Sequence, residues 1–348
     1  MTGAADPSGA ATAHGSPTVR AVFFGSGSFA VPILDALVGV PEVGVVAVVS
    51  APDRPVGRKA VVTPTPVTAH ARALGLPVLQ PVRVRRAEAV EELSALAPEL
   101  IVLADYGQLI PRVLLDLPAR GFLNLHPSAL PRHRGAAPIP ATILAGDIES
   151  AVTLMVVSEE MDAGPIVATA PLAVGPDDTA VTLEERAAGV AAELLGRALP
   201  EWLAGRLVAR PQPAEGVTMT RPLRREDGRL DSSRSAVELE RQVRAYQPWP
   251  GAYLDTDEGR LIVWSAGVAD SEADDVAGEL VAVGRSGLVL ATARDRLVLD
   301  VVQLAGKRRV PAAELRRGYP GLGTVRRSRL GENTQPLADP AVRGQDLE

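Results

Sequence analysis

The strongest constraint on the fold is a series of short, mostly apolar runs separated by segments with helical patterns. VGVVAVVS (43–50) is rich in valine and carries no charge, as expected of a strand that is covered on both faces. VRAVFFGSG (19–27) and ELIVLADYG (99–107) have the same apolar centre. Strands that alternate with helices in this way are typical of a doubly wound, mostly parallel sheet. The sequence therefore predicts a Rossmann-like α/β domain.

A change of pattern near residue 207 indicates a second, smaller domain. The chain has 348 residues, which is more than a single average core requires. A polar, Pro-rich and basic segment begins there, and after one helix the sequence consists of short β-like runs at nearly regular spacing, which favours an OB-like β-barrel. The expected organisation is an N-terminal tail (1–18), the α/β domain (19–206), a linker (207–229), the OB-like domain (230–327) and a flexible C-terminal tail (328–348).

The composition excludes several classes of protein and of site. The absence of cysteine rules out disulfides, thiol catalysis and Cys-based zinc sites, and with only four histidines we expect no metal centre. No apolar run approaches the ~20 residues that span a bilayer, and the first residues lack the basic and apolar regions of a signal peptide. These features fit a cytoplasmic protein with no membrane contact. Nothing demands more than a monomer, and the net charge of −6 argues against a globally basic nucleic-acid binder.

Two local patterns give specific structural expectations. The segment 182–205 carries apolar residues at helical spacing, and Thr182 with Glu185 matches a capping box at its start. The acidic segment ADSEADD (269–275) is expected to be a solvated loop between two strands of the C-terminal domain.

The turn GSGSFA (25–30) has the form G-x-G-x-x-A between a strand and a helix. This form is typical of dinucleotide sites when an acidic residue ends the following strand. Here Ser50 ends that strand, and Asp53 lies beyond it in a loop. A tight, glycine-lined turn is therefore a better interpretation than an NAD site.

The run GFLNLH places two polar side chains at the end of an otherwise apolar strand. Asn124 and His126 are two residues apart, so they point to the same side of the strand, at the carboxyl end where open α/β sheets bind ligands. An amide can donate to a developing oxyanion, and histidine is suited to proton exchange near neutral pH. Asp162 is a candidate third member, with Glu159 and Glu160 as rivals that local spacing does not rank.

The stretch NLHPSALPRHRGAAPI resembles the central motif of the formyltransferases that use 10-formyltetrahydrofolate. Further motifs follow the order found in the methionyl-tRNA formyltransferases of that family: FFGSGSFAVPIL, APDRPVGRKAVVTPTPV, ADYGQLIP, MDAGPI and RAYQPWPGAY. The similarity extends over roughly residues 19–325. By this resemblance the α/β domain is a formyltransferase catalytic domain, and Asn124, His126 and Asp162 form its catalytic group.

The resemblance also implies where the two substrates bind. The folate is expected beside the ADYGQLIP and SALP segments, at Tyr106, Gly107, Gln108, Ser128, Ala129, Leu130 and Pro131. The acceptor end of tRNA is expected at the loop that carries Arg54, Arg58 and Lys59. A second tRNA contact is expected on the C-terminal domain, at Arg241, Arg244, Lys307, Arg308 and Arg309.

The implied reaction is transfer of the formyl group of 10-formyltetrahydrofolate to the α-amine of methionyl initiator tRNA, for translation initiation. In it Asn124 would stabilise the oxyanion, and His126, aided by Asp162, would move protons between the attacking amine and the leaving nitrogen. The nearest alternative is an N-formyltransferase that acts on an amino sugar nucleotide. Another is a non-catalytic RNA-binding protein that retains a formyltransferase fold. Asp105 departs from the family pattern, and the sequence offers no account of it.

Overall fold

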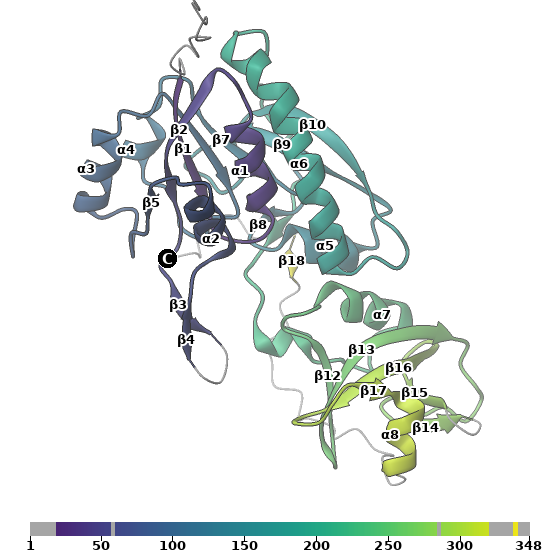
Figure 1. The fold of residues 1–348 in the computed structure, drawn as a ribbon. Helices are drawn as coiled ribbons and strands as arrows, with labels where there is room; N and C mark the ends of the chain where they lie inside the picture. Colours follow the sequence, from purple (N-terminus) through teal and green to yellow (C-terminus); the bar gives the residue numbers. More distant parts are fainter. Residues whose placement is uncertain (1–18, 57–59, 284–286, 320–336, 340–348) are drawn as a thin grey trace, which may run out of the picture.

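The computed structural model describes residues 19–56, 60–283, 287–319 and 337–339. Figure 1 shows a larger α/β part above a smaller part dominated by strands. The α/β part is built on a seven-stranded sheet with the order β10-β9-β7-β6-β1-β2-β5. Its strands are β1 (Val19–Gly25), β2 (Val43–Val49), β5 (Val78–Leu79), β6 (Leu100–Ala104), β7 (Phe122–His126), β9 (Glu149–Val156) and β10 (Ile166–Ala173).

The first five of these strands in chain order are parallel to one another, while β9 runs antiparallel to β7 and to β10. Helices cover both faces of the sheet, in line with the apolar character of its strands. One face is covered by α1 (Ala30–Val38), α2 (Pro66–Ala73), α5 (Pro138–Ala145) and α6 (Ala180–Leu203), and the other by α3 (Ala87–Ala95) and α4 (Arg112–Leu115). No helix in the described part of the chain combines the length and apolar composition needed to cross a membrane.

The C-terminal part is a curled antiparallel sheet with two packed helices. Its strands have the order β12-β13-β16-β15-β14, and β17 pairs with β16. The elements are α7 (Ala236–Ala245), β12 (Ala252–Thr256), β13 (Gly259–Ala269), β14 (Leu280–Val283), β15 (Gly287–Ala291), β16 (Arg296–Leu304), β17 (Val310–Pro311) and α8 (Ala312–Gly318). This part has an apolar core of its own. The predicted fold class, an α/β domain with a smaller β-domain, is confirmed.

Helix α7 joins the two parts, because it packs against α5 of the α/β domain. The Arg241 guanidinium lies directly on Gly146, the left-handed residue that ends α5, where any side chain would overlap it. Arg244 pairs with Glu240 at 2.5 Å and donates to the Asp178 carbonyl at 2.9 Å. Both arginines therefore contribute to the junction between the domains.

The segment expected as a linker is part of the α/β domain's surface. It contains β11 (Met219–Thr220), which pairs with β8 (Arg134–Gly135) inside the central motif, and a short 3₁₀ helix, η1 (Arg225–Gly228). The opposite edge of β11 pairs with β18 (Ala338–Asp339). Within the expected C-terminal tail (328–348) the structure describes 337–339 alone, and Ala338 and Asp339 form this short strand. The expected N-terminal tail lies outside the described residues.

Two local expectations are wrong in their details. Helix α6 begins one turn earlier than predicted, with Thr179 as the N-cap. The backbone N–H of Thr179 donates to the Thr182 hydroxyl and that of Thr182 to the Thr179 hydroxyl, so Glu185 is not needed. The acidic segment 269–275 is not simply solvated. Its Asp275 forms an ion pair of 2.5 Å with Arg296, whose side chain is buried in the C-terminal domain.

Substitution of Leu183 by alanine tests the packing of α6 on the sheet. Leu183 is fully buried in the core of the α/β domain, so the change should lower the free energy of unfolding by about 2–5 kcal/mol, as core leucine truncations do. Urea denaturation measures it. Val181→Ala is the control, since Val181 is 40% exposed on the same helix. Equal losses in both variants would contradict the predicted packing.

Candidate active site

Asn124 and His126 lie on β7, an inner strand of the sheet, at its carboxyl end, and both are buried. Alternation along β7 directs Phe122 toward the α3–α4 side, and Asn124 and His126 share its parity. The Asn124 amide donates to Asp162 Oδ1 at 3.3 Å, and His126 Nδ1 lies 3.6 Å from Asp162 Oδ2. The structure thus brings together the three side chains that the sequence analysis singled out.

Asp162 reaches this position because the loop between β9 and β10 folds back over the sheet edge. Its backbone has a φ of 50°, in the left-handed region. Gly164 lies so close to the Val156 carbonyl of β9 that any side chain would overlap it. This explains why the turn from Asp162 to Gly164, a D-x-G motif, ends in glycine. The Gly135 N–H donates to Asp162 Oδ2 at 2.8 Å and so ties the loop to the central motif.

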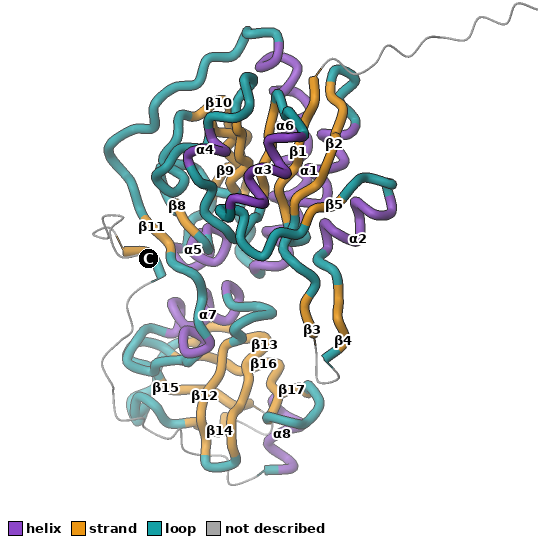
Figure 2. Tube along the Cα trace, turned by 90° about the vertical axis from the view of Figure 1, so that its left-hand side faces the viewer, coloured by secondary structure: helices purple, strands orange, loops and turns teal. Residues whose placement is uncertain are grey.

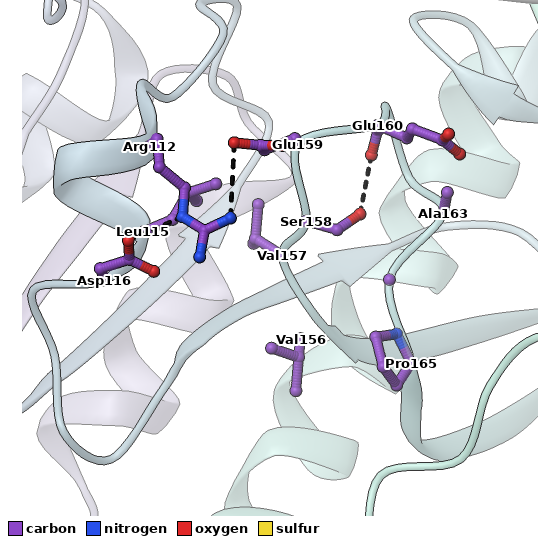
Figure 3. A pocket seen from close by; sticks show the side chains of 11 residues that line it. Arg112, Leu115, Asp116, Val156, Val157, Ser158, Glu159, Glu160, Ala163 and Pro165 are labelled. Atoms are coloured by element: carbon purple, nitrogen blue, oxygen red, sulfur yellow. Dashed lines mark hydrogen bonds and ion pairs between the residues drawn. The ribbon is translucent and has the colours of Figure 1, made fainter.

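The rival carboxylates in the same loop point elsewhere. Glu159 lies 3.5 Å from the Arg112 guanidinium, and both side chains are exposed. Glu160 is exposed, and its backbone carbonyl accepts from the Ser158 hydroxyl at 3.0 Å. Figure 3 shows these residues around a pocket of about 560 Å³ between α4 and the loop. Geometry therefore ranks Asp162 above both glutamates, which local spacing did not do.

The hydrogen bond at the other ring nitrogen of His126 defines the tautomer of the imidazole. Nε2 lies 2.9 Å from the backbone carbonyl of His133. A carbonyl only accepts hydrogen bonds, so Nε2 carries the hydrogen and Nδ1 is the nitrogen available for proton exchange. That nitrogen faces the Asp162 carboxylate, which would stabilise a proton accepted there.

His133 is a residue of the site whose role sequence reasoning missed. It is buried, with a left-handed φ of 56° that aims its carbonyl at His126. Its Nε2 lies 3.0 Å from Asp147, and its N–H donates to the Thr218 hydroxyl at 2.8 Å. Burial holds the pKa of His133 below its ordinary value of 6.5, although the hydrogen bond that its ring donates to Asp147 acts in the opposite direction. The only sequence signal was its place inside the central motif.

The residues expected at the folate have three different kinds of surroundings. The Tyr106 hydroxyl is buried without a hydrogen-bond partner among the described residues, and burial raises its pKa to about 12. Space beside Gly107 is open. In contrast, the Gln108 side chain accepts from the Val84 N–H at 2.8 Å, and the Ser128 hydroxyl donates to the Arg132 carbonyl at 2.7 Å. These two side chains hold the protein's own loops.

The remaining three folate candidates form the turn after Ser128. Leu130 is buried, Ala129 and Pro131 are half-buried, and the Leu130–Pro131 peptide is cis. None of the expected folate-binding residues lines the pocket of Figure 3.

The residues expected at tRNA fall on three different surfaces. Arg54 is exposed on β3 (Arg54–Val56), which forms a hairpin with β4 (Val61–Thr63); Arg58 and Lys59 lie outside the described residues. Both views show this hairpin projecting from the α/β domain in the direction of the C-terminal domain (Figure 1 and Figure 2). Arg241 and Arg244 are committed to the domain junction.

The third surface is the turn after β16, where the remaining basic candidates are exposed. Lys307 has an exposed side chain, and Arg308 pairs with Glu314 at 2.5 Å. The Arg309 guanidinium lies over the ring of Trp264, 3.5 Å from its centroid. An exposed guanidinium stacked on an aromatic ring is held in place, yet its charge can still attract a polyanion.

The structure accounts for Asp105, which the sequence left unexplained. Its carbonyl accepts from the Ser26 N–H at 3.0 Å, and its carboxylate accepts from the Gly27 N–H. One side of the residue is exposed, but the carboxyl group packs against the glycine turn. This burial, together with nearby Glu184, raises its pKa. Asp105 thus closes the predicted tight turn, and a side chain at Gly27 would overlap it.

Residues 19–199 match the formyl transferase family, and residues 222–320 match the formyl transferase C-terminal domain. A methionyl-tRNA formyltransferase of Halorhodospira halophila is 45% identical over 87% of this chain and 98% of its own length. One of Geobacter sulfurreducens is 38% identical over 90% and 97%. The chain belongs to the methionyl-tRNA formyltransferase family.

A solved structure extends the comparison to the fold. WlaRD, a sugar 3N-formyl transferase crystallised with dTDP and 5-N-formyl-THF, superimposes with a TM-score of 0.61 at 13% identity, over 84% of this chain and 99% of its own. At this identity the likeness concerns the fold alone. The resemblance predicted from the motifs is confirmed, and the chain is an enzyme of formyl transfer. Among the described residues no group of three or more His, Asp or Glu side chains is arranged to hold a metal ion.

Replacement of His133 by asparagine tests its buried, neutral state. Because the pKa of His133 is lowered in the folded protein, below about pH 6.5 the unfolded chain binds a proton that the folded chain does not. The wild-type protein should therefore lose stability as the pH falls through 6.5, and the variant should lose less. Urea denaturation at about pH 7.5 and about pH 5.5 measures the difference. An identical pH dependence in both proteins would refute this account.

Proposed function

We propose that this chain transfers the formyl group of 10-formyltetrahydrofolate to the α-amine of methionine on initiator tRNA. The observation that carries the proposal is the meeting of Asn124, His126 and Asp162 at the carboxyl end of β7. The identity of 38–45% to methionyl-tRNA formyltransferases, over most of the chain, supports the acceptor. Asn124, His126 and Asp162 all belong to one chain, so a single copy supplies the whole catalytic group, and the proposed enzyme acts in the cytoplasm, where tRNA is charged.

The first step is attack of the methionyl amine on the formyl carbon. A new N–C bond forms, and the formyl oxygen becomes an oxyanion. The Asn124 amide carries two hydrogens, of which one is held by Asp162. The second is available to the oxyanion, and a donor fixed before the reaction lowers the barrier without reorganisation.

The second step moves a proton and releases the folate. His126 Nδ1 takes the proton that the amine loses, and the cation is stabilised by Asp162 at 3.6 Å. The bond between the formyl carbon and N10 then breaks, and N10 receives a proton from His126. The products are formylmethionyl-tRNA and tetrahydrofolate, and His126 returns to its starting state.

We place the pterin beside Tyr106 and Gly107. Tyr106, Ile110 and Val157 belong to one apolar group on this side of the sheet, which suits a flat ring. The unpartnered Tyr106 hydroxyl is a polar atom that a ligand can satisfy. Gln108 and the turn from Ser128 to Pro131 then act by shaping the wall.

We place the tRNA between the β3–β4 hairpin and the turn after β16. Arg54, Arg58 and Lys59 belong to the first of these, and Lys307 and Arg309 to the second. Arg308 shares its charge with Glu314. Arg241 and Arg244 are left out of the contact, because both are engaged at the domain junction.

The acceptor is tested with labelled 10-formyltetrahydrofolate, offered together with charged initiator tRNA or with an amino sugar nucleotide. We expect label on the tRNA. Label on the sugar nucleotide would retain the catalytic group and reject the proposed acceptor. Label on neither, with folate still bound, would favour the RNA-binding alternative.

Asp162→Asn removes the catalytic charge with little change in volume. Because the cation formed at His126 would lose its carboxylate, kcat should fall about 10²- to 10⁴-fold, the range expected for a lost proton-transfer partner. Single-turnover transfer to Met-tRNA measures the chemical step. Glu160→Gln is the matched control in the same loop, and its kcat should stay close to wild type. A control loss as large as that of Asp162→Asn would remove Asp162 from the mechanism.

Arg309→Ala tests the tRNA surface of the C-terminal domain. If Arg309 contacts a phosphate, the KM for Met-tRNA should rise, and the slope of log KM against log salt should fall by about one. The value of kcat should be retained. Arg206→Ala is the control, because Arg206 is an exposed arginine paired with Glu201 at the far end of α6. Unchanged KM and slope in Arg309→Ala would exclude this contact.

A further inference from the structure

The segment that leads to the C-terminal domain runs along both loops of the active site. Arg210 exchanges backbone hydrogen bonds of 2.7 and 2.8 Å with Ile166, at the start of β10. Farther along, β11 pairs with β8 in the central motif. The Thr220 carbonyl accepts from the Ala136 N–H at 3.2 Å. This segment therefore lies against the catalytic loop on one side and the central motif on the other.

Gln212 is the residue of this segment that reaches the catalytic turn. Its side-chain N–H groups donate to the Asp162 carbonyl at 2.7 Å and to the Gly164 carbonyl at 2.8 Å. Its oxygen accepts from Arg134 Nε at 3.0 Å and from Arg134 Nη2 at 2.7 Å. Both hydrogens and both lone pairs of the amide are thus used.

These bonds act on the geometry of Asp162. The residue has a left-handed backbone, which most side chains disfavour and which surrounding contacts must hold. With the carbonyls of Asp162 and Gly164 fixed by one rigid amide, rotation of the turn is restricted. The Asp162 carboxylate then stays within reach of the Gly135 N–H and of His126.

We propose that Gln212 is a positioning residue for formyl transfer, which acts by holding the D-x-G turn so that the Asp162 carboxylate faces His126 Nδ1. The inference rests on the proposed function only for the choice of reaction. Gln212 itself does not touch the reacting atoms. Its effect should therefore appear in the rate of the chemical step, and not in substrate binding.

The chain supplies a matched control in Gln242 of α7. Its amide donates to the carbonyls of Asp227 and Arg229 at 2.8 and 2.9 Å, and its oxygen accepts from Arg234 at 3.3 Å. This is the same pattern of two carbonyls and one arginine, placed in the C-terminal domain. A purely structural role for such an amide would give Gln212 and Gln242 variants of equal effect.

The test compares full-length Gln212→Glu, Gln212→Met and Gln242→Glu with the wild type. Glutamate keeps the contact with Arg134 but turns a donor into an acceptor that faces two carbonyls. Methionine removes the donors without adding charge, so it serves if the glutamate variant does not fold. The measurements are kcat, KM for both substrates and the thermal midpoint.

We expect a loss of about 10²-fold in kcat for both Gln212 variants, the effect of a small displacement of a catalytic group, with KM values retained. Gln242→Glu should lower the thermal midpoint and leave kcat unchanged.

Two results would overturn the inference: a wild-type kcat in the Gln212 variants, or equal losses of kcat in the Gln212 and Gln242 variants. Failure of the proposed function looks different, because the wild-type protein would then transfer no label to Met-tRNA. In that case the same comparison is made with the acceptor that the wild-type protein does formylate.

Discussion

The hydrogen bond from the Gly135 N–H to the Asp162 carboxylate joins the two loops on which the active site depends. One loop follows β7 and carries the motif around Gly135, and the other connects β9 to β10. Gly135 can make this bond because it has no side chain, since a Cβ there would overlap the Thr220 carbonyl. Thr220 belongs to the segment that leads to the second domain. The catalytic geometry is therefore shared among three parts of the chain that are distant in sequence.

At the junction between the domains, too, polar side chains contact the backbone of distant parts of the chain. Arg244 caps the Asp178 carbonyl before α6, and Arg241 covers the end of α5 at Gly146. These arginines were expected to face phosphates, but the domain junction occupies them. The basic groups that stay available stand on the β3–β4 hairpin and on the turn after β16.

From the sequence we could predict those residues of the site whose side chains form a recognisable pattern. Alternation on β7 predicted that Asn124 and His126 share one face, and the burial of both residues beside Asp162 agrees. The choice of Asp162 over its neighbouring glutamates needed the family resemblance, because three carboxylates stand in one short loop. The roles of His133 and Gln212 were missed, since each acts through backbone carbonyls that no residue pattern reveals.

The sequence by itself determined the class of fold, because valine-rich runs between amphipathic segments have few alternatives to a covered parallel sheet. It also indicated an active site, through an amide and an imidazole at the end of one strand, and the resemblance of the surrounding motifs to formyltransferases supplied the type of chemistry. Tertiary structure alone decided how the Asp162 carboxylate reaches these two side chains and how it is held there. Both outcomes depend on contacts across the fold, the first on the left-handed turn at Asp162 and the second on the path of the segment through Gln212. Both are set by contacts between residues far apart in the chain, which local propensities do not encode.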